Sequence, residues 1–317
     1  MTKKTQLLFA VILLLVVVGC SETEETATFK GKAFVGGSEG LALSFLPGQP
    51  PSEVFDTDNP FQIAVRLENR GEYDIESAGN VIVSITGVNP SNFGVSSSQL
   101  TKQSPDPLDG VRIDSSGNKI SGDDVVVDFP EMNYFSEIQG SVDFTVRANA
   151  CYEYGTKAQA KLCIKEDLRG TTGEAGVCNP DRIVPIENSG APVQITNMEQ
   201  NVAGSNKIDF FFTIKKVGSA SDSLHKTGTV CGTEVSSRDV VYIDVEDTRL
   251  GTLTCSGLTG GTATAGYVTL YSDAREVRCT QVIDESNMID AEVPLSIDVK
   301  YGYKQYVDTQ LIVKHAS

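Results

Sequence analysis

Beyond residue 28, the chain alternates between apolar and polar residues in one segment after another. A period of two places apolar side chains on one side of an extended strand and polar side chains on the other, as in a half-buried β-strand. No stretch of ten or more residues has the 3.6-residue period of an amphipathic helix. The pattern predicts an all-β protein made of antiparallel β-sandwiches. The clearest alternating segments are residues 61–68, 142–150, 158–164, 208–214 and 295–303.

Clusters of Gly, Ser, Asn and Pro separate the predicted strands and predict turns. A domain boundary is expected where Pro185, the Asn188-Ser189-Gly190 cluster and Pro192 interrupt the alternation. This boundary gives two tandem domains, a first sandwich over residues 29–187 and a second over residues 192–317. The first domain is long for a simple sandwich, so residues 89–124 are expected to form an extended loop or an inserted hairpin. The turn clusters lie at residues 35–38, 115–118, 188–190 and 259–262.

A weak internal repeat relates the two predicted domains. Residues 65–71 and 212–218 share an alternating strand that ends in a polar residue, a variable residue and a glycine. Gly71 and Gly218 are expected to adopt positive φ where the chain leaves each strand.

The Asn69-Arg70-Gly71 strand end, together with the stretch of residues 40–51 before the strand at Phe61, carries a family resemblance. It resembles the immunoglobulin-like adhesion modules of bacterial and archaeal surface proteins, often called CARDB-type, and secreted archaeal proteins in particular. The second half departs from the pattern, with Lys216 in place of Asn. The resemblance implies two tandem immunoglobulin-like β-sandwich domains and a cell-surface role.

The N-terminus has the features of a lipoprotein signal peptide. Lys3 and Lys4 precede an apolar run of twelve residues, 7–18, which is too short to span a bilayer but fits a signal-peptide core. The ending Val17-Val18-Gly19-Cys20 resembles a lipobox, although the family pattern prefers Leu to Val17. We therefore predict a signal peptide over residues 1–19, a lipid on Cys20 and an acidic tether over residues 20–28. The alternative is an ordinary secretory signal beside an unrelated cysteine; both alternatives place the rest of the chain outside the cytoplasm.

Charge then limits the classes of partner. The chain carries 26 Lys and Arg against 42 Asp and Glu, a formal charge of −16, and removing the signal leaves −18. An acidic protein of this kind has no basic excess with which to bind nucleic acid or anionic lipid. Membrane contact is thus expected through the two acyl chains on Cys20, which suffice for stable anchoring.

Six further cysteines are expected to form disulfides in an exported chain. Cys151 and Cys163 both continue the polar side of their strands, and a bond between them across one hairpin is geometrically reasonable. Cys255 and Cys279 are candidates for a bond in the second core. Two alternatives remain for Cys178: a bond to Cys231 that clamps the domains together, or a bond to Cys163 that leaves two thiols. The absence of Cys-x-x-Cys and the presence of only two histidines argue against zinc.

Motifs for catalysis are weak. Gly36-Gly37-Ser38-Glu39-Gly40 matches the G-x-S-x-G nucleophile elbow, but a strand is expected after it where the elbow requires a helix. A turn is therefore the preferred interpretation. His225 is expected in a solvated loop and His315 at a frayed end, so neither is a credible general base and the protein is predicted not to be an enzyme.

Acidic clusters offer oxygen ligands of the type that calcium prefers. Asp56 and Asp58 lie just before a predicted strand and are one candidate pair. Calcium is a possible ligand rather than a predicted cofactor, since acidic loops on an acidic protein are usually solvated. The other clusters are Asp244, Glu246 and Asp247, and Asp123, Asp124 and Asp128.

Tyr301, Tyr303 and Tyr306 lie close together on the last predicted strand. Tyr301 and Tyr303 are in phase with Val299, which favours a place in the core with their hydroxyls at its rim. A carbohydrate- or partner-binding patch is the alternative.

Three functions remain. The leading hypothesis is a non-enzymatic, membrane-anchored protein of the cell surface that acts in adhesion, interaction or envelope assembly, with a protein or glycan partner. The second is a solute- or glycan-binding lipoprotein, which would have a concave, aromatic-lined site. The third is a carboxylate-dependent extracytoplasmic hydrolase, which needs two acidic groups about 5–10 Å apart.

Overall fold

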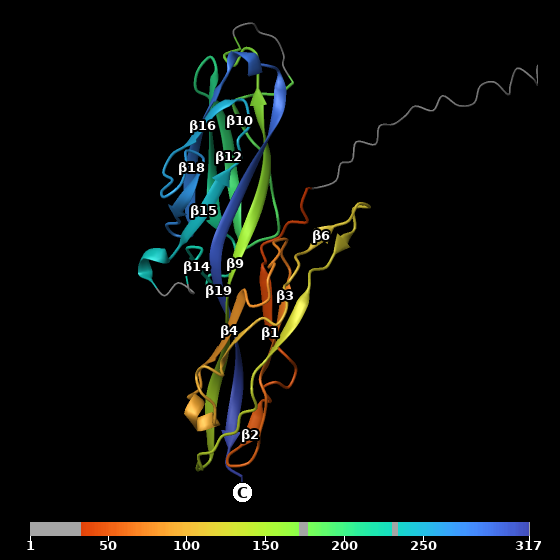
Figure 1. The fold of residues 1–317 in the computed structure, drawn as a ribbon, viewed down its shortest axis with the longest axis vertical. Coiled ribbons are helices and arrows are strands. Elements are labelled where there is room, and N and C mark those ends of the chain that lie inside the picture. Colours follow the sequence, from red (N-terminus) through yellow and green to blue (C-terminus); the bar gives the residue numbers. More distant parts are fainter. Residues whose placement is uncertain (1–32, 171–176, 230–233, 317) are drawn as a thin grey trace, which may run out of the picture. The chain divides into compact units, whose positions relative to one another are not determined.

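The computed structural model describes residues 33–170, 177–229 and 234–316. Strands dominate these residues, and the helical segments among them are three short 3₁₀ turns, Pro90–Phe93, Val235–Ser237 and Glu285–Asn287. The prediction of an all-β sandwich protein is confirmed (Figure 1). None of the helical turns in the described part of the chain has the length and apolar character needed to cross a membrane.

Two of the sheets are small and open. A three-stranded sheet has the order β1-β3-β8, with β1 Leu41–Phe45, β3 Ala64–Asn69 and β8 Asp124–Asp128. A five-stranded sheet has the order β10-β12-β13-β18-β16. Its strands are β10 Arg182–Ile183, β12 Val193–Val202, β13 Lys207–Lys216, β16 Gly251–Cys255 and β18 Ala274–Ile283.

The largest sheet is built on β9 (Ser141–Ile164) and β19 (Ala291–Lys314), in the order β17-β15-β19-β9-β4-β5, with β2, β11 and β14 at its edges. The pair β6 (Arg112–Ile113) and β7 (Lys119–Ile120) forms a separate hairpin inside residues 89–124, as one of the two alternatives predicted. The remaining strands are β2 Glu53–Phe55, β4 Val81–Thr86, β5 Thr101–Gln103, β11 Ile186–Asn188, β14 Ser223–His225, β15 Val240–Val245 and β17 Ala265–Thr269.

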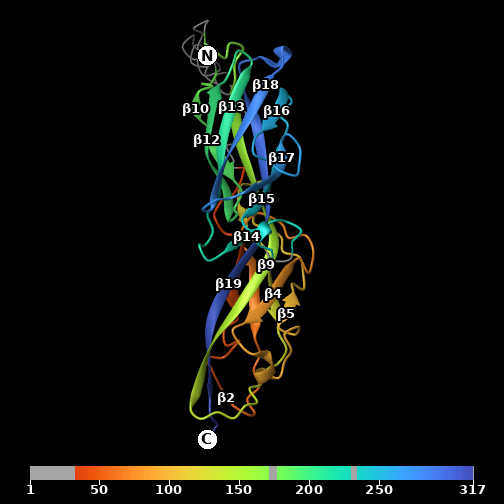
Figure 2. The ribbon, with the colours of Figure 1, turned by 90° about the vertical axis from the view of Figure 1, so that its left-hand side faces the viewer.

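β9 and β19 are antiparallel partners along their whole length of 24 residues each (Figure 2). The two strands predicted at 142–150 and 158–164 are therefore one strand, because Cys151 to Lys157 continue the extended backbone instead of turning. At a rise of about 3.3 Å per residue, such a strand is about 80 Å long.

Each half of this ladder belongs to a different sandwich. In the first sandwich, the β1-β3-β8 sheet faces β4 and the early part of β9: the Leu41 backbone N–H of β1 donates to the Tyr152 hydroxyl of β9. In the second, the five-stranded sheet faces the later part of β9, where the Gln200 side chain of β12 bonds both the N–H and the carbonyl of Cys163. A boundary at 185–192 would separate β9 from β19. The two sandwiches thus share the strands β9 and β19, which a division into tandem domains along the chain does not represent. Residues Ala33–Ser317 form one compact unit.

The internal repeat recurs in the hydrogen bonds. The N–H groups of Arg70 and Gly71 both donate to the Gly40 carbonyl. At the equivalent place, the N–H groups of Val217 and Gly218 both donate to the Pro192 carbonyl.

The expectation of positive φ at Gly71 and Gly218 is wrong, since neither belongs to the residues with positive φ. The reason for glycine at both places is space. A Cβ on Gly71 would overlap the Tyr154 hydroxyl, and one on Gly218 would overlap the Tyr303 hydroxyl.

Candidate functional site

Four buried tyrosines lie at the middle of the β9–β19 ladder. Tyr152 is opposite Tyr303, and Tyr154 is opposite Tyr301. All four are at most 2 % exposed, and burial raises the pKa of each phenol. Their hydroxyls have hydrogen-bond partners; Tyr154, for example, donates to Asn69 Oδ1 at 2.8 Å. The core interpretation of Tyr301 and Tyr303 is therefore confirmed.

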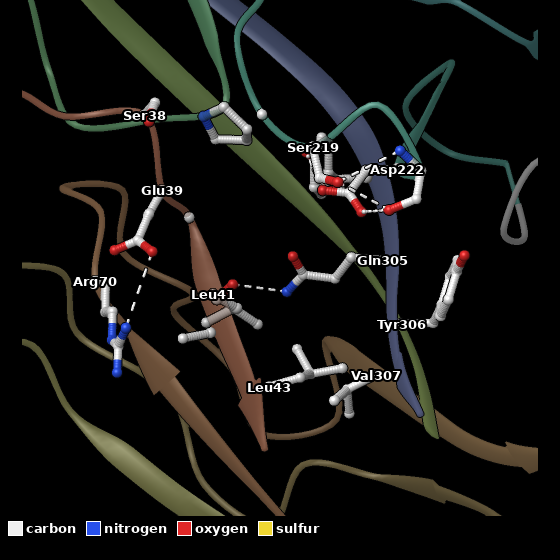
Figure 3. Close-up of a pocket in the computed structure, with 16 residues that line it drawn as sticks. Ser38, Glu39, Leu41, Leu43, Arg70, Ser219, Asp222, Gln305, Tyr306 and Val307 are labelled. Atoms are coloured by element: carbon white, nitrogen blue, oxygen red, sulfur yellow. Dashed lines mark hydrogen bonds and ion pairs between the residues drawn. The ribbon is translucent and has the colours of Figure 1, made fainter. Parts of the chain in front are cut away.

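A groove of about 380 Å³ lies beside this cluster, and we call it the seam groove (Figure 3). It lies between the two sheets of the first sandwich, with β1 on one side and β19 on the other. The 218–222 loop lies at one end. Its side chains come from Ser38, Glu39, Leu41, Ala42, Leu43, Arg70, Pro192, Ser219, Ser221, Asp222, Tyr303, Gln305, Tyr306 and Val307.

The floor of the seam groove is apolar in the middle. Leu41, Leu43 and Val307 line it, and Leu43 and Val307 also pack against the core. Gln305 reaches across from β19, and its Nε2 donates to the Leu41 carbonyl of β1 at 2.6 Å (Figure 3). This hydrogen bond joins the two strands across the groove.

Charged groups form the rim. Glu39 turns toward Arg70, with 3.8 Å between the carboxylate and the guanidinium (Figure 3). Asp222 accepts a hydrogen bond from the Tyr303 hydroxyl at 2.7 Å, and its backbone carbonyl accepts one from Lys216 Nζ. Both rim carboxylates thus have hydrogen-bond or ionic partners, and an apolar floor inside a polar rim suits binding.

The G-x-S-x-G motif leads into the seam groove. Gly36 and Gly37 have positive φ, and strand β1 follows at Leu41, so the segment is a turn, as predicted. Ser38 lines the groove, but no histidine is among the described residues that line it.

His225 does not lie in a solvated loop. It is on β14, opposite Gly302 of β19, and only 3 % exposed. Burial lowers the pKa of its imidazole, and its Nε2 lies 3.8 Å from Cys151 Sγ. A Cβ on Gly302 would overlap the imidazole ring, so glycine at this position makes room for the histidine. The glycine between Tyr301 and Tyr303 is the sequence feature that corresponds to this close approach.

His315 does not fray either. Its Nδ1 lies 2.9 Å from Oδ2 of Asp56, and its backbone N–H donates to the Gly140 carbonyl. Asp56 is 1 % exposed and also accepts hydrogen bonds from the N–H groups of Ile138 and Ala316. Asp56, one of the candidate calcium ligands, thus binds the residues that follow β19 to the turn after β2.

Some residues of the other acidic clusters also have local partners. Asp124 pairs with Arg66 at 2.9 Å, and Asp247 accepts from the Arg249 N–H. Asp244 is opposite Asp298 in the β15–β19 pair; burial, and then the nearby acidic side chains, raise the pKa of Asp298. Within residues 33–170, 177–229 and 234–316, no three acidic, His or Cys side chains are grouped closely enough to hold a metal ion.

Two disulfides are present among the described residues, Cys163–Cys178 and Cys255–Cys279. The second was predicted, and the first was one of the two alternatives for Cys178. The bond predicted between Cys151 and Cys163 is wrong: twelve residues on one extended strand place them about 40 Å apart. The Cys178–Cys231 clamp is wrong too, because Cys178 is bonded to Cys163. Cys151 is disulfide-bonded; Cys20 and Cys231 lie outside the described residues.

Tyr306, the third residue of the tyrosine motif, is 37 % exposed at the seam groove. The Arg147 guanidinium stacks on its ring at 3.6 Å and also binds both carboxylate oxygens of Asp308. Sequence reasoning singled out Tyr306 but not Leu43, Asp222 or Gln305. Alternation marks a residue as facing one side of a strand, but it does not tell which strand of the other sheet it faces.

Comparisons with known proteins supply no family. No family model matches the chain, and no curated protein matches it. Among solved structures, the chain aligns with the collagen binding domain of the Erysipelothrix rhusiopathiae surface protein RspB. That alignment has 8 % identity over 87 % of this chain and 96 % of the other, with a TM-score of 0.11. A TM-score of this size carries no argument about fold or function.

Proposed function

We propose that this protein is a non-enzymatic, lipid-anchored protein of the cell surface that binds a protein partner through the seam groove. The observation that carries the proposal is the groove itself, with its apolar floor at Leu43 and Val307 and a rim whose carboxylates already have partners. A site of this composition can exclude water from a partner without activating a nucleophile.

The location outside the cytoplasm is supported by two independent features. The N-terminal segment has the order of a lipoprotein signal, ending at Cys20. The bonds Cys163–Cys178 and Cys255–Cys279 are typical of proteins that fold in an oxidising compartment. The resemblance of residues 40–51 and of the Asn69-Arg70-Gly71 strand end to CARDB-type adhesion modules agrees with a surface role.

The shared ladder suits a protein that presents a binding surface. Tandem domains usually meet at a flexible linker, and relative motion is then the default. Here the backbone passes between the sandwiches twice within one hydrogen-bonded pair, β9 and β19. We therefore propose that the seam groove of the first sandwich and the 218–222 loop at its end are held rigidly relative to each other.

Site-specific photo-crosslinking on intact cells tests this proposal. We would place p-benzoylphenylalanine at Ser219, which is exposed at the groove, and as the matched control at Lys102, which is exposed on β5 at the far edge of the sheet. A discrete cross-linked protein with the Ser219 variant and none with the Lys102 variant is expected. Equal labelling from both positions, or from neither, would contradict a partner at the groove.

A further inference from the structure

Among the described residues, one segment of β19 has no strand partner on the side away from β9. On the side away from β9, β19 pairs with β15 at residues 297–300, with β14 at 302–304 and with β2 at 312–314. Residues 305–311 are left without a strand partner on that side, and we call them the open segment. It is seven residues long, and its first three residues, Gln305, Tyr306 and Val307, line the seam groove.

The direction of the backbone groups in the open segment follows from its neighbours. The Ile312 N–H donates to the Ser52 carbonyl on the β2 side. Because successive residues of a strand point their N–H and C=O groups to alternate sides, those of Tyr306, Asp308 and Gln310 point away from β9, into the unpaired edge. No backbone hydrogen bond to these three residues on that side occurs among residues 33–170, 177–229 and 234–316.

The facing strand β1 is also an edge strand. It pairs with β3 only, and the Leu46 N–H just after it donates to Ala64 of β3. By the same alternation, the backbone groups of Leu43 and Phe45 point away from β3, and Leu43 lines the seam groove. The Leu41 backbone, which would do so as well, is occupied by the Tyr152 hydroxyl and by Gln305.

We infer that the seam groove receives an extended segment of a partner protein, which pairs with the open segment and extends the β19 edge of the sheet. This inference rests on the proposed function and names the form of its partner. Unpaired N–H and C=O groups in a row are a template for one more strand, and such strand addition is a recurrent mode of peptide recognition.

The flanking strands decide between possible occupants. A second copy of this chain that paired through the same edge would offer its own β19, which continues in both directions past the seven open residues. That strand would collide with β14 at one end and with β2 at the other, since both already occupy the edge. A short segment whose ends turn away from the sheet fits between them.

The side chains around the groove specify the segment further. Alternate residues of an added strand would face Leu43 and Val307, which favours apolar side chains at those positions, and the others would face solvent. The rim carries two carboxylates, Glu39 and Asp222, against one guanidinium, Arg70, in a protein of formal charge −16. A basic residue in the segment, and the absence of acidic ones, would match this charge.

The test uses the oxidised mature chain with Cys20→Ser and a displayed library of seven-residue peptides. Peptides with alternating apolar residues and a basic residue are expected to be enriched. On binding, the amide protons of Tyr306, Asp308 and Gln310 are expected to exchange at least about tenfold more slowly, since each would gain a ladder hydrogen bond. Failure to enrich any alternating peptide, or binding without slower exchange at these amides, would overturn the inference.

A matched pair of variants separates strand pairing from side-chain contact. Asp308→Pro and Asp308→Ala both remove the ion pair with Arg147, but only proline removes the outward N–H and blocks the edge. We expect the proline variant to bind the enriched peptide about tenfold more weakly than the alanine variant. Equal affinity would overturn the inference.

If Asp308→Pro does not fold, the exchange measurement on the Cys20→Ser chain decides alone. Sedimentation of the same chain checks the other occupant: self-association that Asp308→Pro abolishes would assign the edge to a second copy and also overturn the inference. If cross-linking from Ser219 persists in the Asp308→Pro chain, strand addition is contradicted and the proposed function still stands. Loss of all groove cross-linking in the unmodified chain would end both.

Discussion

His315 and Asp56 are 259 residues apart in the sequence, yet His315 Nδ1 lies 2.9 Å from Asp56 Oδ2. Asp56 holds the last residues of the chain through two groups, the Ala316 N–H and the His315 ring, and it also accepts from the Ile138 N–H of the loop before β9. A buried carboxylate therefore fastens the C-terminal end of the ladder to the turn after β2.

This contact predicts a pH-dependent stability. Hydrogen bonds from Ala316, His315 and Ile138 lower the pKa of Asp56 to about 2, so its contribution is complete above the ordinary value of 3.8 and is lost as pH falls toward 2. The hydrogen bond to Asp56 raises the pKa of His315 above 6.5, so that contribution is complete below 6.5 and is lost as pH rises through the higher value. The pair should therefore stabilise most between about pH 4 and 6.5.

Thermal unfolding of the wild type and of His315→Gln measures this effect. The difference in Tm is expected to be larger at about pH 5.5 than at about pH 8.5. His225→Gln is a useful control, because burial lowers rather than raises the pKa of His225. A difference for His315→Gln that grows toward alkaline pH would contradict the assignment.

Gly218 should tolerate alanine only when its tyrosine is shortened. An added Cβ would overlap the Tyr303 hydroxyl, while its next neighbour is Pro192 Cβ at 3.0 Å. Gly218→Ala is expected to lower the free energy of unfolding by about 1–3 kcal/mol, as for other overpacked sites. Tyr303→Phe removes the overlapping oxygen, so the double variant should be more stable than the sum of the two single changes, as a denaturant double-mutant cycle would show.

Gly71 supplies the contrasting case. A Cβ there would overlap the Tyr154 hydroxyl, and it would also lie 2.6 Å from the backbone carbonyl oxygens of Glu39 and Gly190. Removing the hydroxyl with Tyr154→Phe leaves both carbonyls in place. Gly71→Ala is thus expected to stay destabilising in the Tyr154→Phe background, and a rescue as complete as that of Gly218→Ala would show that the carbonyls can move aside.

The two disulfides should contribute similar stability. Cys163–Cys178 closes 15 residues and Cys255–Cys279 closes 24. The chain-entropy model gives about 3 kcal/mol for each, with little dependence on loop length over this range. We expect comparable losses in urea unfolding for Cys163→Ser with Cys178→Ser and for Cys255→Ser with Cys279→Ser. A peptide map that joins Cys178 to any cysteine other than Cys163 would contradict the pairing.

Cys20 is predicted to carry the lipid. Cys20→Ser should move the protein from the detergent phase to the aqueous phase in detergent partitioning and should abolish labelling by a radioactive fatty acid. Ser21→Ala, beside it, should change neither. Detergent partitioning unaffected by Cys20→Ser would favour an ordinary secretory signal.

Local alternation of apolar and polar residues was enough to predict the strands and the fold class. The alternation at 208–214 and 295–303 is local, and it follows from the fact that one side of a strand is buried whatever covers it. The repeat of residues 65–71 at 212–218 likewise predicted two related sandwiches. The pairing of Cys255 with Cys279 was also predicted, because Cys255 is in phase with Leu253 and Cys279 with Val277, and the structure pairs them on the neighbouring strands β16 and β18.

How the two sandwiches share these strands depends on pairing between segments that are distant in the sequence. β9 ends at Ile164 and its partner β19 begins only at Ala291, so the two paired strands are far apart in the sequence. A period of two contains no information about which partner a strand takes. For the same reason, the sequence did not place Cys151 and Cys163 on one strand, His225 in the core or His315 on Asp56. The open segment exists because β14 and β2 cover the edge of β19 on both sides of residues 305–311, a relation between three segments that are distant in the sequence.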